Sequence, residues 1–465
     1  MEVLQRTANR GSISTGGYEV DNSCKFEDAN SEGLHKAISS MSRVTFTLSF
    51  WIKRTALGAQ RIVGAGASGD NEVIIHFKSD NTLEFYSWEG AYAMRYLTNR
   101  VFRDTSAWYH LAFLVDTTNG TAGDRVKIYV NGVQETSFSA TTVPGQNSQF
   151  DFTNNLYVGK AGAAADADFS GYMSEFVYLD GTQAASTDLG EVDSDSGIWK
   201  PIDVSGLTFG TNGAYLDFKD SANLGNDANG GTDFTETNIT AADQATDTPT
   251  NNFATLNPLF KYPSSQVISQ GATLVTRTSG SGLNKTFYTT QGVTSGKWYI
   301  EAQLSGSHGM VGATTMTSMS SYAPDGTYTG TQSTDIGYYS YNGQYYIGAS
   351  GQGAWGEGNW NTTSHIMQIA IDMDNRKIYF GINNTYQASG NPAGNSNGIT
   401  LPDTSDGYML AFSYDGSGVW KLNTGGYTTM TISSAASDAN GYGTFEYAPP
   451  TGYYALCTKN LAEYG

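Results

Sequence analysis

Residues 44–53 read VTFTLSFWIK, and this stretch decides the fold class. Hydrophobic side chains occupy every second position, namely Val44, Phe46, Leu48, Phe50 and Ile52. Successive side chains of a β-strand point to opposite faces, so this alternation predicts a strand that turns one face towards a hydrophobic core. The same period of two recurs through most of the chain, which indicates a protein built from strands.

The rest of the first module gives strand signals at short spacing. They occupy residues 61–64, 73–77, 82–86, 108–116, 125–130, 156–159 and 171–179. Asn131-Gly132 follows one of these runs and is a dipeptide typical of a two-residue hairpin turn. No stretch shows the period of a convincing amphipathic helix. Many short strands of this kind predict a β-sandwich or a barrel over residues 18–200.

The second half of the chain repeats this pattern with more tyrosine. Its strand signals occupy residues 267–268, 272–277, 296–303, 309–313, 336–349, 365–374, 377–383 and 408–414. The run 336–349 predicts a hairpin around Asn342-Gly343. The predicted fold class is therefore all-β, with two antiparallel β-sandwich (jelly-roll) modules at 18–200 and 258–432.

The residues between the two modules, 201–257, are mostly Asn, Asp, Thr and Gly. Such residues favour turns, and so polar a segment cannot bury a core of its own. Ala214–Phe218 nevertheless alternates like a strand, and the residue before Pro249 should be extended. We expect an ordered polar linker belt here. The two remaining segments are an N-terminal attachment segment at 1–17 and a C-terminal extension at 433–465.

The composition limits the possible functions. The chain has 25 basic and 44 acidic residues and a net charge of −19, which disfavours binding to a nucleic-acid backbone. Only 15% of residues are charged and 13% are aromatic, as expected of an extracellular or virion surface protein. Cys24 and Cys457 lie near opposite ends of the chain and are expected to be reduced thiols. We expect neither a signal peptide nor membrane insertion.

Both modules resemble known domain families. In the first, LSFWIKR (48–54), SAWYHLAFLVDTT (106–118) and FSGYMSEFVYLDG (169–181) resemble the laminin-G-like and concanavalin A-like lectin sandwich. In the second, GKWYIEAQ (296–303) and IMQIAIDMDNRKIYFGINN (366–384) resemble the SPRY sandwich. These resemblances imply the sandwich fold. They do not imply one ligand, because the same folds serve many functions.

The succession of these stretches along the whole chain resembles bacteriophage virion proteins of the tail-fibre or receptor-recognising type. This resemblance implies a non-enzymatic structural protein on the tail or capsid surface, extracellular after release. The implied partners are other virion proteins and a host cell-surface polysaccharide or receptor, and a homotrimer is a further expectation. One alternative is a capsid or tail decoration protein with no external ligand.

A polysaccharide depolymerase is the least favoured alternative. The catalytic branch of the lectin-like family places its carboxylates in a Glu-x-Asp-x-x-Glu or Glu-x-Asp-x-Glu pattern on one strand. The nearest run here is Glu191-Val-Asp193-Ser-Asp195, in a polar loop and with Asp where the last Glu should stand. His110 lies within a predicted strand, so we interpret it as a packed, hydrogen-bonded side chain rather than as a catalyst.

Two regions have the composition of a glycan-binding site. Aromatic rings stack on sugar C–H surfaces, while amides and carboxylates bind sugar hydroxyls. The predicted ligand-binding residues are Trp355, Trp360, Tyr345, Tyr346, Asn359, Glu357, Trp88 and Tyr92. We expect Trp355 and Trp360 to be the most exposed, because Gly-rich sequence surrounds them. The alternative is packing, in which alternating tyrosines of a hairpin serve the core and a neighbouring strand.

No cofactor is expected, with one alternative left open. Some laminin-G-like domains bind Ca²⁺ through loop oxygens, and this ion needs six to eight of them. The candidate ligands are Asp70, Asn71, Asp166 and Asp168.

Overall fold

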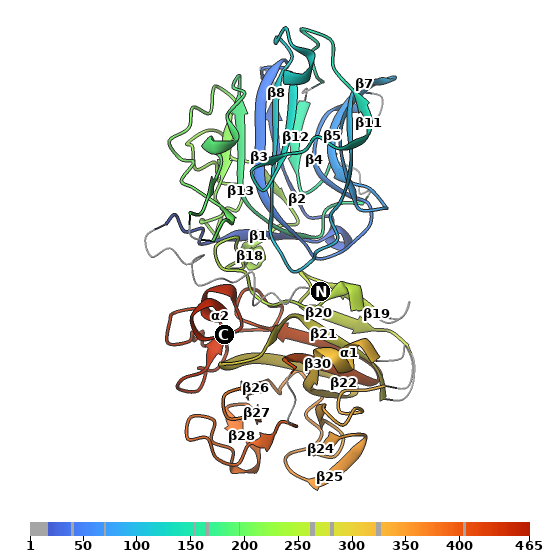
Figure 1. Ribbon diagram of the computed structural model, residues 1–465, viewed down its shortest axis with the longest axis vertical. Helices are drawn as coiled ribbons and strands as arrows, with labels where there is room; N and C mark the ends of the chain where they lie inside the picture. Colours follow the sequence, from blue (N-terminus) through green and yellow to red (C-terminus); the bar gives the residue numbers. More distant parts are fainter. Residues whose placement is uncertain are drawn as a thin grey trace. The chain divides into compact units, whose positions relative to one another are not determined.

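The computed structural model describes residues 17–38, 41–68, 71–151, 154–162, 167–194, 196–260, 266–279, 283–321, 327–402 and 406–465. The chain forms two compact units, whose described parts lie within 17–250 and 251–465. We call them the N-terminal and C-terminal units. Strands are the main regular secondary structure of both, which confirms the predicted all-β class (Figure 1). No helix among the described residues is long and apolar enough to cross a membrane.

The N-terminal unit is a sandwich of two antiparallel sheets. The first sheet contains, in order, β10 (Val133–Gln134), β9 (Val126–Val130), β8 (Tyr109–Asp116), β3 (Thr45–Arg54), β13 (Gly171–Asp180), β1 (Ser23–Phe26) and β18 (Gln244–Ala245), with β16 (Ala214–Leu216) also paired to β13. The second contains β11 (Phe138–Thr142), β7 (Tyr92–Val101), β6 (Thr82–Glu89), β5 (Asn71–Phe77), β4 (Gln60–Ser68), β12 (Asn154–Val158), β2 (Gly33–Ile38) and β17 (Thr235–Thr237). Their facing side chains form one hydrophobic core.

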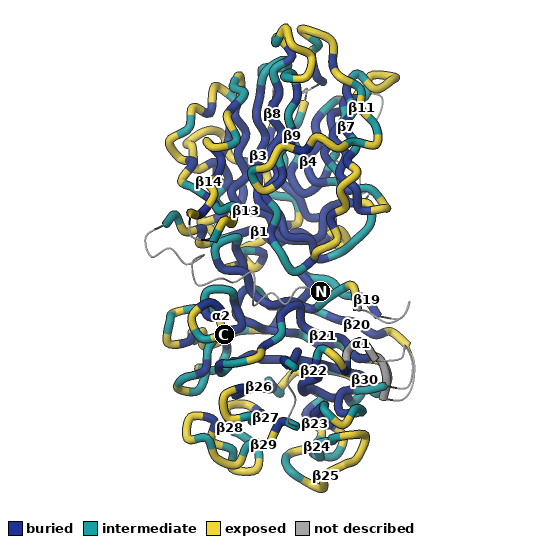
Figure 2. The backbone as a smooth tube through the Cα atoms, viewed as in Figure 1, coloured by how far each residue is buried: buried dark blue, intermediate teal, exposed yellow. Residues whose placement is uncertain are grey.

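The stretch that predicted the fold is β3, a central strand of the first sheet. Phe46, Phe50 and their alternate neighbours enter the core, as the alternation predicts. The opposite face of the strand is also buried, because residues 184–215 fold over it and bring Leu189, Val204 and Phe209 against the sheet. Figure 2 shows these central strands as continuously buried. A two-stranded ribbon, β14 (Glu191–Val192) and β15 (Trp199–Lys200), belongs to this covering segment.

The residues of the predicted linker belt are divided between the units. Up to Thr250 they belong to the N-terminal unit and add β16, β17 and β18 to its sheets. From Asn251 onward they belong to the C-terminal unit, where Phe253 forms a bridge with Cys457. Cys24 and Cys457 are both free, as predicted, and both are buried. The predicted attachment segment lies, except for Gly17, outside the described residues.

The C-terminal unit is built on one branched sheet, antiparallel apart from β31. Its strands are β19 (Gln266–Ser269), β20 (Leu274–Arg277), β21 (Leu283–Val293), β22 (Lys297–Thr315), β23 (Ile336–Tyr339), β24 (Gln344–Ile347), β25 (Ser350–Ala354), β26 (Met367–Asp372), β27 (Lys377–Ile382), β28 (Thr385–Tyr386), β29 (Ile399–Thr400), β30 (Tyr408–Asn423) and β31 (Tyr454–Ala455). Two short helices, α1 (Met316–Ser321) and α2 (Thr458–Tyr464), complete it. The long strand β22 pairs with β26 in its first half and with β23 in its second, and β30 runs beside both halves.

One buried carboxylate ties the C-terminal extension to this sheet. Glu301 on β22 is fully buried and accepts the backbone N–H groups of Glu446 and Tyr447 at 2.9 and 2.8 Å. It also accepts hydrogen bonds from Tyr299 and Asn423. Four donors compensate for the burial of the charge, so residues 433–465 pack as part of the unit.

Candidate functional site

The outer face of β5, β6 and β7 carries the group of side chains best suited to bind a ligand. On β5 and β6 the odd-numbered positions Val73, Ile75 and Phe85 enter the core, so the even-numbered ones face outward. We call this group the β5–β7 patch. Its members are Glu72, His76, Glu84, Tyr86, Trp88, Tyr92 and Arg95.

Aromatic rings meet edge to face at one end of the patch. A register shift between β6 and β7 after Ser87 sets Tyr92 opposite Trp88, and their ring centroids lie 4.9 Å apart at 84°. The Tyr86 ring lies 5.8 Å from that of Tyr92, and the Arg95 guanidinium lies 4.5 Å from the Tyr92 centroid. Trp88 is half-buried and Tyr92 is exposed. These two predicted residues therefore do lie together at the surface.

Charged side chains fix the other end of the patch. Glu84 accepts Arg95 Nε at 2.6 Å on one oxygen, and its other oxygen lies 2.7 Å from His76 Nε2 and 3.3 Å from Lys78 Nζ. Burial alone would raise the pKa of Glu84, but the hydrogen bonds from His76 and Arg95 and the nearby charges outweigh it and lower the pKa to about 2. Glu84 is thus a fixed anion that orients its neighbours.

The carboxylates of the patch are not arranged as a glycanase pair. Glu72 pairs across the strands with Trp88, and Glu84 with His76, so the two glutamates are four residues apart along the sheet. That spacing corresponds to roughly 13 Å. Glycanases hold their two carboxyl groups about 5–9.5 Å apart. Glu84 is also held by basic partners, which leaves it unsuited to donate a proton.

The hairpin β23–β24 of the C-terminal unit separates its tyrosines between two faces. Tyr338 and Tyr345 pair with each other and contact the core, together with Trp355. Tyr339 and Tyr346 contact each other on the opposite face, with ring centroids 6.0 Å apart. The first face, with Tyr338 and Tyr345, therefore follows the packing alternative. The second face also includes the exposed Tyr341 and the half-buried Tyr328.

The predicted exposure of Trp360 is wrong. Its side chain is fully buried and stacks on Tyr338 at 5.6 Å and 21°. The Gly-rich loop turns back over the hairpin, so glycine content here reflects close packing rather than exposure: a Cβ on Gly356 would lie 2.6 Å from the Tyr338 hydroxyl. Trp355 is half-buried against the core, while Glu357 and Asn359 are exposed. The predicted residues of this region therefore do not form one exposed surface.

The two described calcium candidates, Asn71 and Asp168, lie far apart on the sheet. Asn71 pairs with Ser68 at the end of β4, whereas Asp168 forms a bridge with Arg61 at its beginning. Seven residues of strand separate the two places, or roughly 23 Å. Asp168 is buried beside Lys160, with 3.4 Å between Nζ and Oδ2. Asp70 and Asp166 lie outside the described residues. Within the described ranges, no three His, Cys, Asp or Glu side chains form a group that could hold a metal ion.

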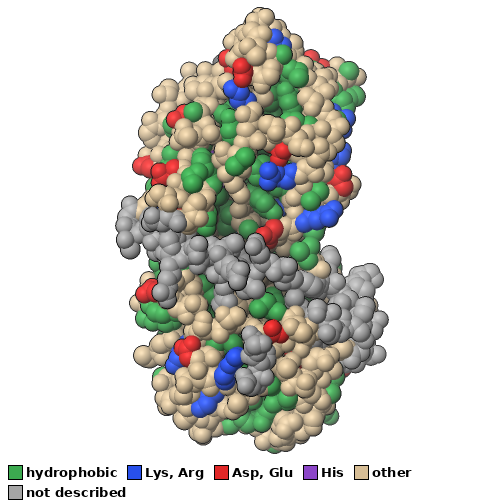
Figure 3. All heavy atoms as spheres, viewed as in Figure 1, with side chains coloured by type: hydrophobic (Ala, Val, Ile, Leu, Met, Phe, Trp, Pro, Cys, Tyr) green, Lys and Arg blue, Asp and Glu red, His purple; other side chains and the backbone are tan. Residues whose placement is uncertain are grey.

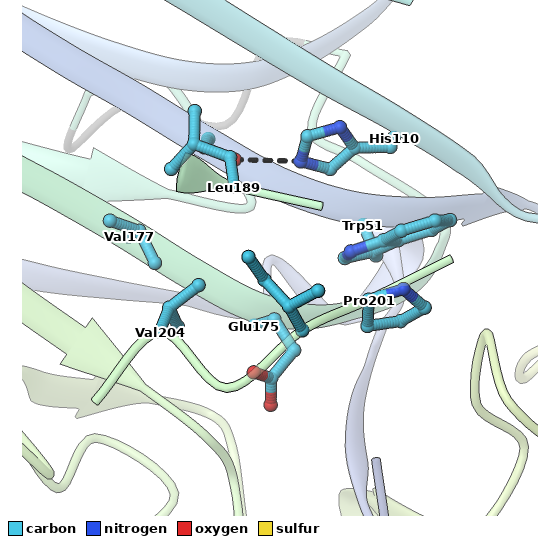
Figure 4. Close-up of a pocket in the computed structure, with 9 residues that line it drawn as sticks. Trp51, His110, Glu175, Val177, Leu189, Pro201 and Val204 are labelled. Atoms are coloured by element: carbon cyan, nitrogen blue, oxygen red, sulfur yellow. Dashed lines mark hydrogen bonds between the residues drawn. The ribbon is translucent and has the colours of Figure 1, made fainter. Parts of the chain in front are cut away.

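His110 lines a small buried pocket under the covering segment (Figure 4). Its Nε2 lies 2.8 Å from Ser49 Oγ, the dashed line of Figure 4, and its Nδ1 accepts Trp199 Nε1–H at 3.0 Å. An indole N–H only donates, so the neutral imidazole carries its hydrogen on Nε2 and donates it to Ser49. Burial lowers the pKa of His110 to about 3. His110 cannot then act as a base on Ser49, and it is the packed histidine that the sequence predicted.

Glu175 lines the same pocket from a bulge in β13, and its carboxylate points away from His110. It accepts hydrogen bonds from Tyr215 at 2.7 Å and from Tyr18 at 3.1 Å. Burial raises the pKa of Glu175 from 4.5 to about 7, although both hydrogen bonds counteract the shift.

This carboxyl predicts a pH-dependent stability. Between about pH 4.5 and pH 7 it ionises in the unfolded chain but not in the folded one, so stability falls as the pH rises through this window. The loss levels off above pH 7 and amounts to about 3 kcal/mol. We expect Glu175→Gln to match the wild type in urea unfolding at pH 4 and to be more stable by about this amount at pH 8. Equal stabilities at pH 8 would contradict the assignment.

Comparison with known proteins finds similarity to a lectin-like family in the N-terminal unit. Residues 28–186 match the Laminin_G_3 model, described as the concanavalin A-like lectin/glucanases superfamily. No curated protein matches the chain. Among solved structures, a putative carbohydrate binding protein from Bacteroides ovatus is 20% identical, with 48% of this chain and 60% of that chain covered and a TM-score of 0.33.

Two further solved structures are similar to this chain. Mouse laminin α1 domains LG4-5 are 10% identical, with 88% of this chain and 90% of that chain covered and a TM-score of 0.31. The SPRY domain of human HERC1 is 16% identical, with 36% and 96% covered and a TM-score of 0.27. The β5–β7 patch lies within the residues that match the concanavalin A-like lectin model.

Proposed function

We propose that this protein is a non-enzymatic, lectin-like protein whose N-terminal unit binds glycans through the β5–β7 patch. One observation carries the proposal: Trp88 and Tyr92 form a surface-accessible aromatic corner, 4.9 Å between centroids, beside fixed polar groups. The patch lies within the residues similar to the concanavalin A-like lectin family. We expect the patch to bind glycans without cleaving them, because Glu72 and Glu84 lie farther apart than the two carboxyl groups of a glycanase.

The patch supplies both halves of sugar recognition. The ring faces of Trp88 and Tyr92 offer apolar surface for sugar C–H groups. Glu72 accepts the Tyr86 hydroxyl at 2.5 Å, and Arg95 is held by Glu84, so charged groups stand at fixed places beside the rings. Groups that are already ordered lose little conformational entropy when a ligand binds. No metal is needed for such contacts.

Replacing Trp88 by alanine is expected to weaken glycan binding about ten-fold, because stacking on a large ring contributes about 1.4 kcal/mol. Affinity electrophoresis in gels that contain mannan, dextran or extracted bacterial surface polysaccharide measures the retardation. Trp88→Phe keeps a ring and should retain most of it. Tyr157→Ala, a half-buried tyrosine on β12 outside the patch, is the matched control. Unchanged retardation in both Trp88→Ala and Tyr92→Ala would exclude the patch.

The same polysaccharides test the non-enzymatic part of the proposal. Their length after incubation with the protein, measured by size-exclusion chromatography, should not change. Shortening would contradict the proposal and favour a depolymerase.

We further propose a setting for this binding, on the basis of the resemblance along the whole chain: a virion surface protein of a tailed bacteriophage that contacts host polysaccharide or receptor and other virion proteins. The acidic balance fits a surface component, and the face in Figure 3 shows Lys and Arg only in small scattered groups. Antibodies against the chain should label intact particles, and the purified protein should compete with particle adsorption to cells. Labelling without competition would instead favour a decoration protein with no external ligand.

A further inference from the structure

The outward face of hairpin β23–β24 forms a second cluster in which aromatic and polar side chains meet. We call it the tyrosine face; it consists of Tyr328, Tyr339, Tyr341, Tyr346, His308 and Asp415. The neighbouring strands β22 and β30 shift register here, and the shift sets His308 opposite Asp415. Gly306 permits the shift with a φ of +99°, since a Cβ there would approach Gly418 Cα to 2.9 Å.

Tyr341 is the exposed ring of this face. Its side chain is 59% exposed, among the highest values for large hydrophobic residues in the described chain. It is nevertheless held in place, because the His308 ring contacts it edge to face at 5.0 Å and the Tyr339 ring lies 5.9 Å away. The turn at Asn342-Gly343 follows it directly and presents it outward. An exposed aromatic ring that is already ordered offers a flat apolar surface at low entropic cost.

His308 contributes a hydrogen-bond donor. Its Nδ1 lies 3.2 Å from Ser340 Oγ, which itself accepts the Gly309 N–H at 2.9 Å. Because that oxygen already accepts, its hydroxyl hydrogen can point to Nδ1, and a neutral imidazole then carries its own hydrogen on Nε2. No hydrogen bond from a described residue reaches Nε2.

Asp415 contributes an acceptor. Its Oδ2 accepts the Tyr339 hydroxyl, and no described residue donates to its Oδ1. The Asp415 carboxylate is thus held through Oδ2 and the His308 imidazole through Nδ1. Oδ1 and Nε2 are the atoms available to a ligand. No Lys or Arg belongs to the tyrosine face, so an anionic ligand would meet only the negative charge of Asp415.

We propose that the tyrosine face is a second glycan site, which takes a neutral sugar residue. The sugar's C–H face stacks on Tyr341, one hydroxyl donates to Asp415, and another accepts from His308 Nε2–H. The inference extends the proposed glycan binding, but it uses none of the β5–β7 residues.

Saturation-transfer NMR on the full chain tests this site. The probes are the methyl glycosides of glucose, galactose and mannose, with methyl glucuronide and tetramethylammonium as competitors of other charge. We expect transfer to at least one neutral glycoside. In a Trp88→Ala background, which removes the contribution of the β5–β7 patch, Tyr341→Ala and Asp415→Asn should each weaken it about ten-fold, while Tyr341→Phe should retain it.

Trp88→Ala separates this site from the first, because it should leave the neutral glycoside signal of the tyrosine face unchanged. Hydrogen exchange across β22 and β30 verifies that each variant is folded. The proposal is overturned if no neutral glycoside receives transfer, if Tyr341→Ala leaves transfer intact, or if tetramethylammonium alone binds. Loss of binding in Trp88→Ala with retention in Tyr341→Ala would leave only the β5–β7 site.

Discussion

Replacing Trp360 by alanine is expected to destabilise the C-terminal unit by about 3–5 kcal/mol. The indole is fully buried, stacks on Tyr338 and lies 6.0 Å from the Trp420 ring. Its removal leaves a cavity between the β23–β24 hairpin and the central strand β30, and a stiff aromatic core cannot collapse to fill it. Hydrogen exchange measures this loss. The amides of β22 and β30 should lose protection, while those of the N-terminal unit should keep it.

Trp355→Ala is the matched control for this experiment. It removes the same side chain from the same Gly-rich segment, but Trp355 is half-buried and contacts the core at its edge, with 6.1 Å to the Phe380 ring. We expect it to cost less than half as much. If the two variants were equally stable, Trp360 would not be the core residue that the structure shows. Glycan binding in the N-terminal unit should survive both changes.

The strand pattern of this protein was predictable, because the alternation of β3 is a local property of the sequence. The burial of the second face of β3 was not predictable from such a pattern. Trp51 lines a pocket with Leu189 and Pro201, and Lys53 pairs with Asp247. These partners lie more than a hundred residues away in the chain, and no local period encodes such contacts. The segment expected to be a linker belt provides part of this cover, through β16 and the residues before it.

The candidate sites were predictable only in part. Trp88 and Tyr92 lie on either side of one turn, so sequence alone could bring them together. Arg95 and Glu72 join them through strand register, which sequence does not show, although outward positions of alternating strands were a usable signal. Around Trp360 the glycines allow close packing of the loop on the hairpin, so glycine content does not indicate exposure there. The hairpin alternation that buries Tyr338 was visible in the sequence and would have suggested that aromatic residues nearby share its core.

Replacing Asp247 by alanine is expected to destabilise the N-terminal unit by about 3–5 kcal/mol, because it removes the carboxylate that pairs with a buried ammonium. Asp247 lies 2.6 Å from Lys53 Nζ, and it accepts the Trp108 indole N–H at 3.0 Å. Both ionic side chains are almost completely buried. Burial lowers the pKa of Lys53, and the negative charge of Asp247 opposes this shift by stabilising the buried ammonium. Urea unfolding with hydrogen exchange in β3 and β8 measures the loss.

A double variant separates the ion pair from simple packing. Lys53→Met with Asp247→Asn removes both charges and keeps an oxygen that can accept the Trp108 N–H. It should be more stable than Asp247→Ala alone, because replacing both members of a buried pair avoids an uncompensated charge. If the double variant lost as much stability as the two single variants together, the pair would contribute through side-chain shape alone. Asp247 lies just after β18, nearly two hundred residues later in the chain than Lys53 on β3. The expected loss would therefore show that residues beyond the predicted first module, 18–200, are required for the stability of its sandwich.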